Sequence, residues 1–359
     1  MNDRGAEGTG HVRRRAVTLE DVALRAGVSL KTASNAVNGT GRMGEATRER
    51  VLAVVHDLGY KVNVAARNLT MGTTGAISLA AQTLRSAYLA ELAEAVIAAA
   101  RVRDRTVYVS TYEDDGTQGL HQFLRQYNQS HTDGLLLSLT EYEHLEPVDF
   151  DVDHPMVCFG VRNTFGLVDR VATDHRRDAQ TATDFLIGHG SRRIAVVGAH
   201  QVFDPIAIAG ATEGNADLRL RGILERCAAA GLQLDPRLVG VTGFDWTIGQ
   251  GFRAARDIIE SGVPFDGMVC LNDGLAIGAI SALRESGIRI PDDVQVIGFD
   301  NNEESEYLTP SLTTMDSRLE WIAETAVDRL LRRIAAPGTL GPAELHARSH
   351  LVARGTTRS

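Results

Sequence analysis

The stretch that decides the fold of the N-terminal region is TLEDVALRAGVSLKTASNAVNG, residues 18–39. Thr18 and Asp21 are three residues apart, the spacing of a capping box at the start of a helix. Gly27 permits the left-handed backbone on which helices commonly end. Between these signals, apolar side chains recur at the spacing of one helix face, namely Leu19, Val22, Ala23 and Ala26. The pattern predicts a short helix followed by a tight glycine turn.

A second short helix is expected from Leu30 to about Val37, with Ser29 as its N-cap. Its apolar face is small, and the opposite face carries a polar stripe at helical spacing, formed by Lys31, Ser34, Asn35 and Asn38. Such side chains can donate hydrogen bonds to base edges and phosphates. An isolated polar stripe is, however, more often simply a solvated helix face.

A third helix favours the DNA-binding interpretation of that stripe. Apolar side chains repeat at helical spacing up to Gly59, at Val51, Val54, Val55 and Leu58. Two short helices joined by a glycine turn and supported by a third form a helix-turn-helix. We therefore expect a polar N-terminal tail over residues 1–15 and an all-α, DNA-binding headpiece over residues 16–62.

The run VTLEDVALRAGVSLKTASNAVNG, residues 17–39, resembles the headpiece of the lactose/galactose repressor (LacI/GalR) family. The segments TRERV (47–51) and LGYKVN (58–63) match this family as well. The resemblance implies that the second helix reads the operator. The resemblance implies base contacts by Leu30, Lys31 and Asn35 and phosphate contacts by Ser29 and Thr32. We also expect Thr18, Ser34 and Asn38 at the DNA-binding surface.

Two positions of the headpiece depart from the usual family pattern. Relatives usually have Val where this chain has Ala33, and often Arg where it has Asn35. Neither change threatens the expected fold. The operator sequence, however, cannot be transferred from better-known relatives.

Residues 63–74 are expected to form a hinge. The segment NVAARNLTMG, residues 63–72, is alanine-rich and long enough for about two helical turns, which is marginal for an isolated helix in water. Its simplest interpretation is a linker. The family resemblance implies more: two such segments pair on the operator and Leu69 wedges into the minor groove, where Arg67 or Asn68 is expected to contact the backbone.

After Gly75, short apolar runs alternate with helical patterns, which is typical of doubly wound parallel sheets. The expected strands are Ala76–Ala80, Thr106–Ser110, Gly134–Leu139, Pro155–Phe159, Ile194–Val197, Gly267–Leu271 and Val294–Phe299. The expected helices are Ala87–Val102, Arg177–Gly188, Leu218–Ala230, Gly249–Glu260 and Gly274–Ser286.

This body is too long for a single sheet of that kind. We expect two lobes within residues 75–355, with the periplasmic-binding-protein-like architecture that the resemblance implies. The first lobe is expected over about 75–173 and 304–336, and the second over about 174–303 and 337–355.

Ligands of such folds bind at the carboxyl ends of the strands. Asn272 and Asp300 directly follow two expected strands, and Trp246 lies near the start of an expected helix. Carboxylate, amide and a flat aromatic face suit a polyhydroxylated ligand. Each residue also has a simpler interpretation, as a helix cap or as part of the core.

The body resembles the same family, with close matches in LNDGLAIGA (271–279) and IPDDVQVIGFD (290–300). The resemblance implies that Arg219, Asn272 and Asp300 contact an effector and that Trp246 stacks on a sugar, as in some members. Tyr88 and Asp174 are expected near this pocket. Two departures affect the effector's identity: Gly160 stands where some sugar-binding members have aspartate, and residues 202–217 form a longer segment than usual.

Charge is unevenly distributed along the chain. The net charge is −9, yet residues 1–72 carry 11 Lys/Arg against 7 Asp/Glu and the remainder carries 26 against 39. A basic head on an acidic body is compatible with local DNA contact, although the asymmetry alone is weak evidence. We find no signal-peptide pattern and no apolar run long enough to span a membrane, and expect a cytoplasmic protein.

Other function classes are less favoured. No motif of nucleotide hydrolysis, serine hydrolysis, zinc proteolysis or dinucleotide binding is present, so we expect no enzyme, no cofactor and no metal site. A sugar-binding transport component would lack the headpiece. The sequence predicts a homodimeric repressor that binds a pseudo-palindromic operator under control of a small effector, a sugar or sugar derivative, with a purine or nucleoside as the alternative.

Overall fold

The computed structural model describes residues 17–61, 73–112, 119–127, 131–139, 141 and 144–358. The chain divides into two compact units, residues 1–74 and 75–359. Arg67, Asn68 and Leu69 of the expected hinge lie outside the described residues. Among the residues that are described, no helix is long and apolar enough to cross a membrane.

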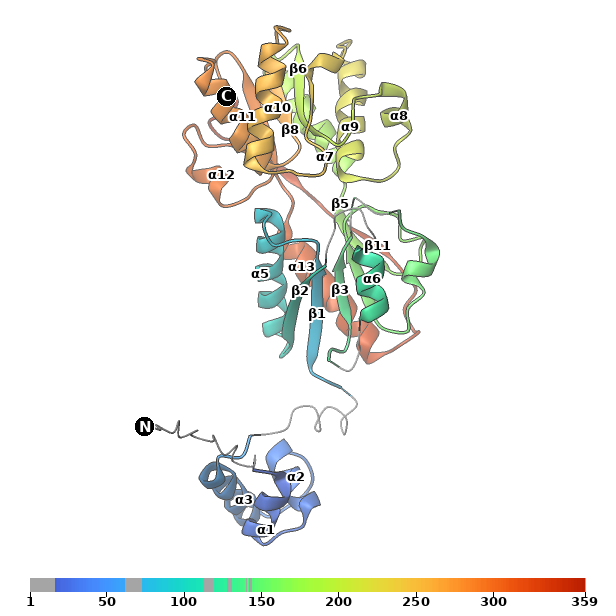
Figure 1. The fold of residues 1–359 in the computed structure, drawn as a ribbon, viewed down its shortest axis with the longest axis vertical. Helices are drawn as coiled ribbons and strands as arrows, with labels where there is room; N and C mark the ends of the chain where they lie inside the picture. The colour runs from blue at the N-terminus through green and yellow to red at the C-terminus, as the bar shows by residue number, and fades with distance from the viewer. Residues whose placement is uncertain are drawn as a thin grey trace, which may run out of the picture. The chain divides into compact units, whose positions relative to one another are not determined.

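The first unit contains the three predicted helices, α1 (Leu19–Ala26), α2 (Leu30–Asn38) and α3 (Glu45–Leu58) (Figure 1). The capping box of α1 is present, and Gly27 ends that helix with a φ of 64°. A small core holds the three helices together, built from Val22, Ala23, Ala26, Ala33, Ala36 and Val51. The alanines allow α1 and α2 to approach closely, which confirms the helix-turn-helix.

The second unit contains two sheets. In the described residues, the first sheet has the strand order β2-β1-β3-β4-β5-β11, and its registered pairs are all parallel. The strands are β1 (Ala76–Ala81), β2 (Thr106–Thr111), β3 (Leu135–Ser138), β4 (Met156–Phe159), β5 (Asp169–Thr173) and β11 (Glu344–Ala347). The helices that accompany it are α5 (Ala87–Arg101), α6 (Gly119–Gln126) and α13 (Leu319–Ala335), with a 3-10 turn at Pro147–Phe150.

The second sheet repeats this order as β7-β6-β8-β9-β10-β12, with only the pairing of β12 with β10 antiparallel among the registered pairs of the described residues. Its strands are β6 (Ile194–Ala199), β7 (Val239–Val241), β8 (Gly267–Cys270), β9 (Gln295–Asp300), β10 (Thr313–Asp316) and β12 (His350–Val352). Its helices are α7 (His175–Gly188), α8 (Pro205–Gly210), α9 (Asn215–Ala229), α10 (Ile248–Glu260), α11 (Asp273–Glu285) and α12 (Glu304–Tyr307), with a 3-10 turn at Pro236–Leu238. The pairs α7/α9 and α10/α11 pack together around this sheet (Figure 1).

The sheets divide the C-terminal part of the chain differently from the expected lobe boundaries. Strand β10 lies within residues 304–336 yet pairs with β9 in the second sheet, whereas β11 lies within 337–355 yet pairs with β5 in the first. Within residues 144–358 the chain crosses between sheets after β5, after β10 and after β11. Periodicity cannot reveal such exchanges, because the sheet that a strand joins depends on partners far away in sequence.

The sheet orders place a switch point in each lobe. Strand order reverses between β1 and β3 in the first sheet and between β6 and β8 in the second. At such points neighbouring chain segments leave the sheet in opposite directions, and ligands of doubly wound folds bind there. Asn272, two residues after β8, therefore lies where the fold favours a binding site.

Candidate functional site

The N-terminus of α2 is preorganised by its cap. The backbone N–H of Thr32 donates to the Ser29 hydroxyl at 3.1 Å, and the two hydroxyls lie 2.8 Å apart. Leu30 is 47% exposed although it is apolar, and Lys31 is exposed beside it. An exposed leucine and lysine on the first turn of a short helix fit a surface that another molecule covers.

The rest of the polar stripe is held by side-chain contacts. The Asn38 amide donates to the Ser34 hydroxyl at 3.2 Å, and the Thr40 hydroxyl donates to the Asn35 carbonyl oxygen at 3.4 Å. A Cβ at Gly41 would lie 2.5 Å from Asn35 Nδ2, so this glycine lets the following loop approach the Asn35 side chain. These contacts limit the freedom of Asn35.

Thr18, also predicted at the DNA surface, performs a structural task. Its hydroxyl donates to the Asp21 carboxylate at 2.8 Å and accepts from the Asp21 backbone N–H at 3.3 Å. Asp21 in turn accepts the Thr18 backbone N–H at 2.8 Å. A phosphate contact by Thr18 stays a prediction, and any such contact would involve a hydroxyl that is already engaged.

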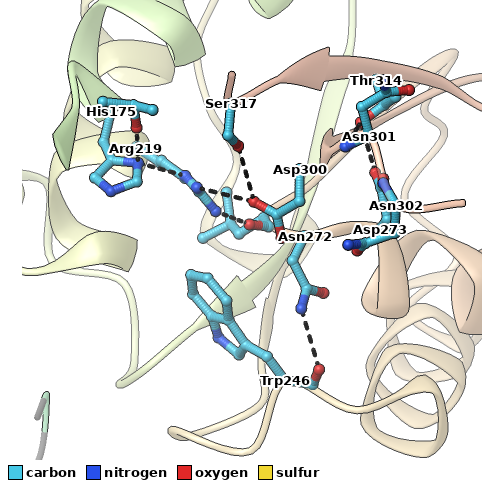
Figure 2. Close-up of polar contacts among 12 residues, drawn as sticks. His175, Arg219, Trp246, Asn272, Asp273, Asp300, Asn301, Asn302, Thr314 and Ser317 are labelled. Carbon is cyan, nitrogen blue, oxygen red and sulfur yellow. Dashed lines mark hydrogen bonds and ion pairs between the residues drawn. The ribbon is translucent and has the colours of Figure 1, made fainter. Parts of the chain in front are cut away.

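In the second unit, Arg219 is the centre of a polar cluster (Figure 2). We call it the Arg219 cluster, and it consists of His175, Arg219, Trp246, Asn272, Asp300 and Ser317. Arg219 Nε donates to His175 Nδ1 at 3.1 Å, and Nη1 donates to the Leu271 carbonyl oxygen. Nη2 lies 3.7 Å from Asp300 Oδ1. The guanidinium also lies over two aromatic rings, 4.5 Å from the centroid of Phe299 and 5.6 Å from that of Trp246.

Asp300 is the acidic member of this cluster and is buried at the end of β9. Burial raises the pKa of its carboxyl to about 6, while Arg219 opposes that rise and Glu91 adds to it. The Ser317 hydroxyl donates to Asp300 at 3.4 Å. The backbone of Asp300 has a φ of 105°, which is uncommon for a residue with a side chain. Strain of this kind is concentrated at functional sites.

Asn272 lies two residues after β8 and Trp246 lies two residues before α10, and their polar atoms are largely used within the protein. Asn272 Oδ1 accepts from the Leu275 backbone N–H at 2.7 Å and caps α11, while Nδ2 donates to the Trp246 carbonyl oxygen at 3.2 Å. The Trp246 indole N–H donates to the Gly198 carbonyl oxygen at 3.0 Å. Asn272 therefore caps a helix, and Trp246 lies beside Arg219. The half-buried indole keeps an accessible part for contact with a ligand.

The remaining predicted effector residues differ in their relation to the Arg219 cluster. Burial raises the pKa of the Tyr88 hydroxyl, the charge of Asp300 raises it further, and the charge of Arg219 lowers it. Tyr88 belongs to α5, so the first lobe lies close to the Arg219 cluster at this residue. Asp174 instead caps α7, because its carboxylate accepts the Arg177 backbone N–H at 3.1 Å.

His175 and Ser317 are the two cluster members that were not predicted as site residues from the sequence. A partial signal was available, since His175 directly follows Asp174, which was expected near the pocket, although β5 itself was not among the expected strands. Ser317, at a crossover that the sequence did not place, had no comparable signal.

Asp273 supports the loop that carries Asp300. Its buried carboxylate accepts from the Ser305 hydroxyl at 2.7 Å, the Thr314 hydroxyl at 2.6 Å and the Asn302 backbone N–H at 3.0 Å. Burial raises its pKa to about 7, and the nearby Asp300 adds to the rise. Asp273 thus joins α11, α12 and β10, and it lies to the side of Asn272 and Asp300 in Figure 2.

Residues 202–217, the longer segment noted in the sequence, reach from the second lobe to the first. The Asn163 backbone N–H donates to the Glu213 carboxylate at 2.8 Å, and the Asn215 backbone N–H donates to Glu141 at 3.3 Å. Burial raises the pKa of Glu141 to about 7. The carboxylates Glu213 and Glu141 therefore connect the lobes directly through backbone amides.

A small helical unit with an exposed polar recognition helix, combined with two doubly wound lobes, defines a DNA-binding regulator with a ligand-sensing body. Comparisons with known proteins agree with this class. The model of the bacterial regulatory proteins of the lacI family matches residues 18–63, and that of the periplasmic binding protein-like domain matches residues 183–357.

Individual relatives extend this match over the whole length. The chain is 32% identical over 324 residues to the HTH-type transcriptional repressor PurR of Erwinia tasmaniensis, covering 89% of this chain and 91% of that relative. The solved lac repressor dimer bound to operator and the anti-inducer ONPF is 26% identical, with 96% of this chain and 100% of that chain covered and a TM-score of 0.79. The complex of the regulator CelR with cellobiose is 27% identical, with coverages of 95% and 99% and a TM-score of 0.68.

The protein belongs to the lacI family of bacterial regulatory proteins. It is a DNA-binding transcriptional repressor with a small-molecule effector, and not an enzyme. The predicted fold class, a helix-turn-helix headpiece and a two-lobed periplasmic-binding-protein-like body, is confirmed.

Proposed function

We propose that this repressor binds a pseudo-palindromic operator as a homodimer and that a sugar or sugar derivative, bound between the two lobes, controls its affinity for DNA. The observation that carries the effector proposal is the Arg219–Asp300 pair, buried at the end of β9 beside the half-buried face of Trp246. One donor and one acceptor held side by side can bind two neighbouring hydroxyl groups. The indole face beside them suits the C–H face of a sugar ring.

A pair of carboxyl groups on opposite lobes also supports a ligand rich in hydroxyl groups. Glu141 and Asp217 come from opposite lobes, and the charge of Asp217 reaches Glu141 and raises its pKa. Burial raises the pKa of Asp217 itself. Acceptors of this kind are satisfied by hydroxyl or amino groups of a ligand. The similarity to CelR, solved with cellobiose, is consistent with a carbohydrate.

A purine or nucleoside is the second candidate effector. It is favoured by the 32% identity to PurR, a relative of purine-type effector specificity. The same Arg219–Asp300 pair can bind the donor and acceptor atoms on one edge of a purine, and Trp246 can stack on its face.

The experiment that separates the two effector classes is a thermal-shift screen of the full chain against sugars, sugar phosphates, nucleosides and purine bases. A ligand at a hundred times its dissociation constant stabilises the folded state by about 2.7 kcal/mol, a shift of roughly 5 °C for a domain of this size. A sugar hit that disappears in Asp300→Asn supports the proposal. A hit restricted to purines establishes the second candidate instead.

The DNA-binding part of the proposal rests on α2 and on the hinge. Leu69 lies outside the described residues, and its wedge role stays a prediction from the family resemblance. Leu69→Ala is expected to weaken operator binding while the thermal unfolding of the body is unchanged.

The operator is expected to contain two half-sites about one helical turn apart. A footprint should show that one dimer protects both half-sites. Protection of a single half-site by a monomer would contradict the homodimer.

A further inference from the structure

A cavity of about 300 Å³ opens beside the crossover from β5 to α7. Both lobes contribute to it: Arg170 and His346 come from the first sheet, and Asp174, His175, Arg176 and Arg221 come from the second lobe. Its wall includes neither Arg219 nor the residues Trp246, Asn272 and Asp300. The cavity shares His175 with the Arg219 cluster and Asp174 with the predicted effector residues, and is otherwise separate from them.

Three guanidinium groups line this cavity, and each is held by a carboxylate that does not line it. Glu225 accepts from Arg176 Nε at 2.8 Å and from Arg221 Nε at 3.0 Å. Glu344 lies 2.8 Å from Arg170 Nη2. These pairs orient the guanidinium groups. In the described part of the chain, Nε of Arg170 is buried and has no hydrogen-bond partner.

His175 adds a further donor to the wall. Its Nδ1 accepts the Nε–H of Arg219, so the neutral ring carries its proton on Nε2. Burial lowers the pKa of His175 well below its usual value, and the charges of Arg219, His346 and Arg170 lower it further. The cationic groups Arg219 and Arg170 thus lie close to this ring, while Asp174 contributes one carboxylate to the same wall.

We propose that this cavity is a second ligand site, which binds a small organic anion through its phosphate or carboxylate oxygens. Guanidinium groups match such oxygens in geometry and charge, and bind them by strong charge-assisted hydrogen bonds. The volume admits a molecule of the size of a sugar phosphate. Because the wall combines both lobes and includes His175, an anion there contacts the lobe crossover and the partner of Arg219.

The test is isothermal titration of the full chain with inorganic phosphate, glucose 6-phosphate and citrate, and with glucose as the uncharged comparison. The expected result is saturable binding of at least one anion. Arg221→Gln should weaken that binding roughly 10-fold or more, the contribution of a charge-assisted hydrogen bond. Binding of phosphates alone identifies a phosphate ester site, and binding of citrate alone identifies a carboxylate site.

The matched control is Arg226→Gln. Arg226 lies on the same helix, α9, and pairs with Asp184 at 2.6 Å outside the cavity wall. This variant should retain the wild-type anion affinity. If Arg221→Gln fails to fold, Arg176→Gln replaces it, since Arg176 is exposed and lines the same wall. Absence of anion binding below about 10 mM, or equal losses in the cavity and control variants, overturns the proposal.

Discussion

The recognition helix and the Arg219 cluster are both polar sites, but they are built in opposite ways. The predicted contacts of α2 and its N-cap all lie within residues 29–38, and the side chains at the start of the helix are exposed. The Arg219 cluster combines six residues from positions 175 to 317, and its charged pair is buried. The side chains of the first site are free to contact another large molecule. Many polar atoms of the second site, by contrast, already form hydrogen bonds or ion pairs within the protein.

This difference has an energetic consequence. Replacing an exposed side chain of α2 removes a contact with DNA and leaves the folded headpiece nearly unchanged. Replacing a buried member of the second site leaves partners without hydrogen bonds, which costs folding free energy before any ligand binds. Variants in the two regions should therefore separate binding from stability, and the following predictions test that separation.

The largest effect is expected for Asp273→Ala. The change leaves the Ser305 and Thr314 hydroxyls and the Asn302 N–H without their acceptor, so the free energy of unfolding should fall by about 3 kcal/mol. Urea denaturation of the second unit's transition measures it. Glu260→Ala, which removes an exposed partner of Arg256, is the control and should change little. Equal effects of the two variants would contradict a supporting role for Asp273.

Asp300→Asn should weaken effector binding by roughly 10- to 100-fold, because it removes a charged acceptor from the proposed site. Since burial raises the pKa of Asp300 to about 6, the carboxylate is protonated as the pH falls through that value. Effector affinity of the wild type should therefore decrease from pH 7 to pH 5. Titration calorimetry at several pH values checks both statements.

The pH dependence should be absent from Asp300→Asn, whose amide does not ionise. Operator affinity without effector should be the same in the variant and in the wild type. A variant that keeps the same decrease below pH 6 would assign the titration to another group, such as Asp178, whose pKa burial also raises to about 6.

Lys31→Ala and Asn35→Ala should each cost about 1–3 kcal/mol in operator binding if these residues contact bases, with much less effect on random DNA. Fluorescence anisotropy with operator and scrambled duplexes measures the difference. Glu49→Ala, at an exposed position of α3, serves as the control for unspecific charge effects. Equal losses on both duplexes would reassign Lys31 or Asn35 to phosphate contacts.

The smallest effect is expected for Thr18→Ala, which removes the hydroxyl of the capping box and should destabilise the headpiece by about 1 kcal/mol. Thermal unfolding followed by circular dichroism measures it. If Thr18 also contacts phosphate, operator affinity should fall at temperatures at which the headpiece is fully folded. Unchanged affinity under those conditions leaves Thr18 with the capping role alone.

Much of the fold was predictable from local patterns. The three headpiece helices, their caps and the first strands and helices of both lobes follow from the spacing of apolar residues, and the structure confirms them. Short strands such as β7 and β12 were not expected, because three residues carry too little periodicity. The sheet membership of β10 and β11 also differed from expectation, since it depends on pairing with β9 and β5.

The candidate site was predictable to a similar extent. The rule that ligands meet strand ends located Asn272 and Asp300, and the family resemblance added Arg219 and Trp246. The strand-end rule indicates where the site residues lie in the sequence, but it does not indicate which groups they contact. It could not show that His175 receives a hydrogen bond from Arg219, or that both polar groups of the Asn272 amide are engaged within the protein.

The sequence by itself determined the helix-turn-helix, because a capping box, a glycine turn and a helical apolar face all act over fewer than ten residues. It also determined the alternation that requires parallel sheets. Only the tertiary structure decided how the chain crosses between the lobes and which charges meet beneath Asp300. The pairing of β11 with β5 joins residues more than a hundred positions apart, and the Arg219–Asp300 pair joins two different elements of the second lobe. The energies of these contacts arise from burial, which exists only once the lobes are packed.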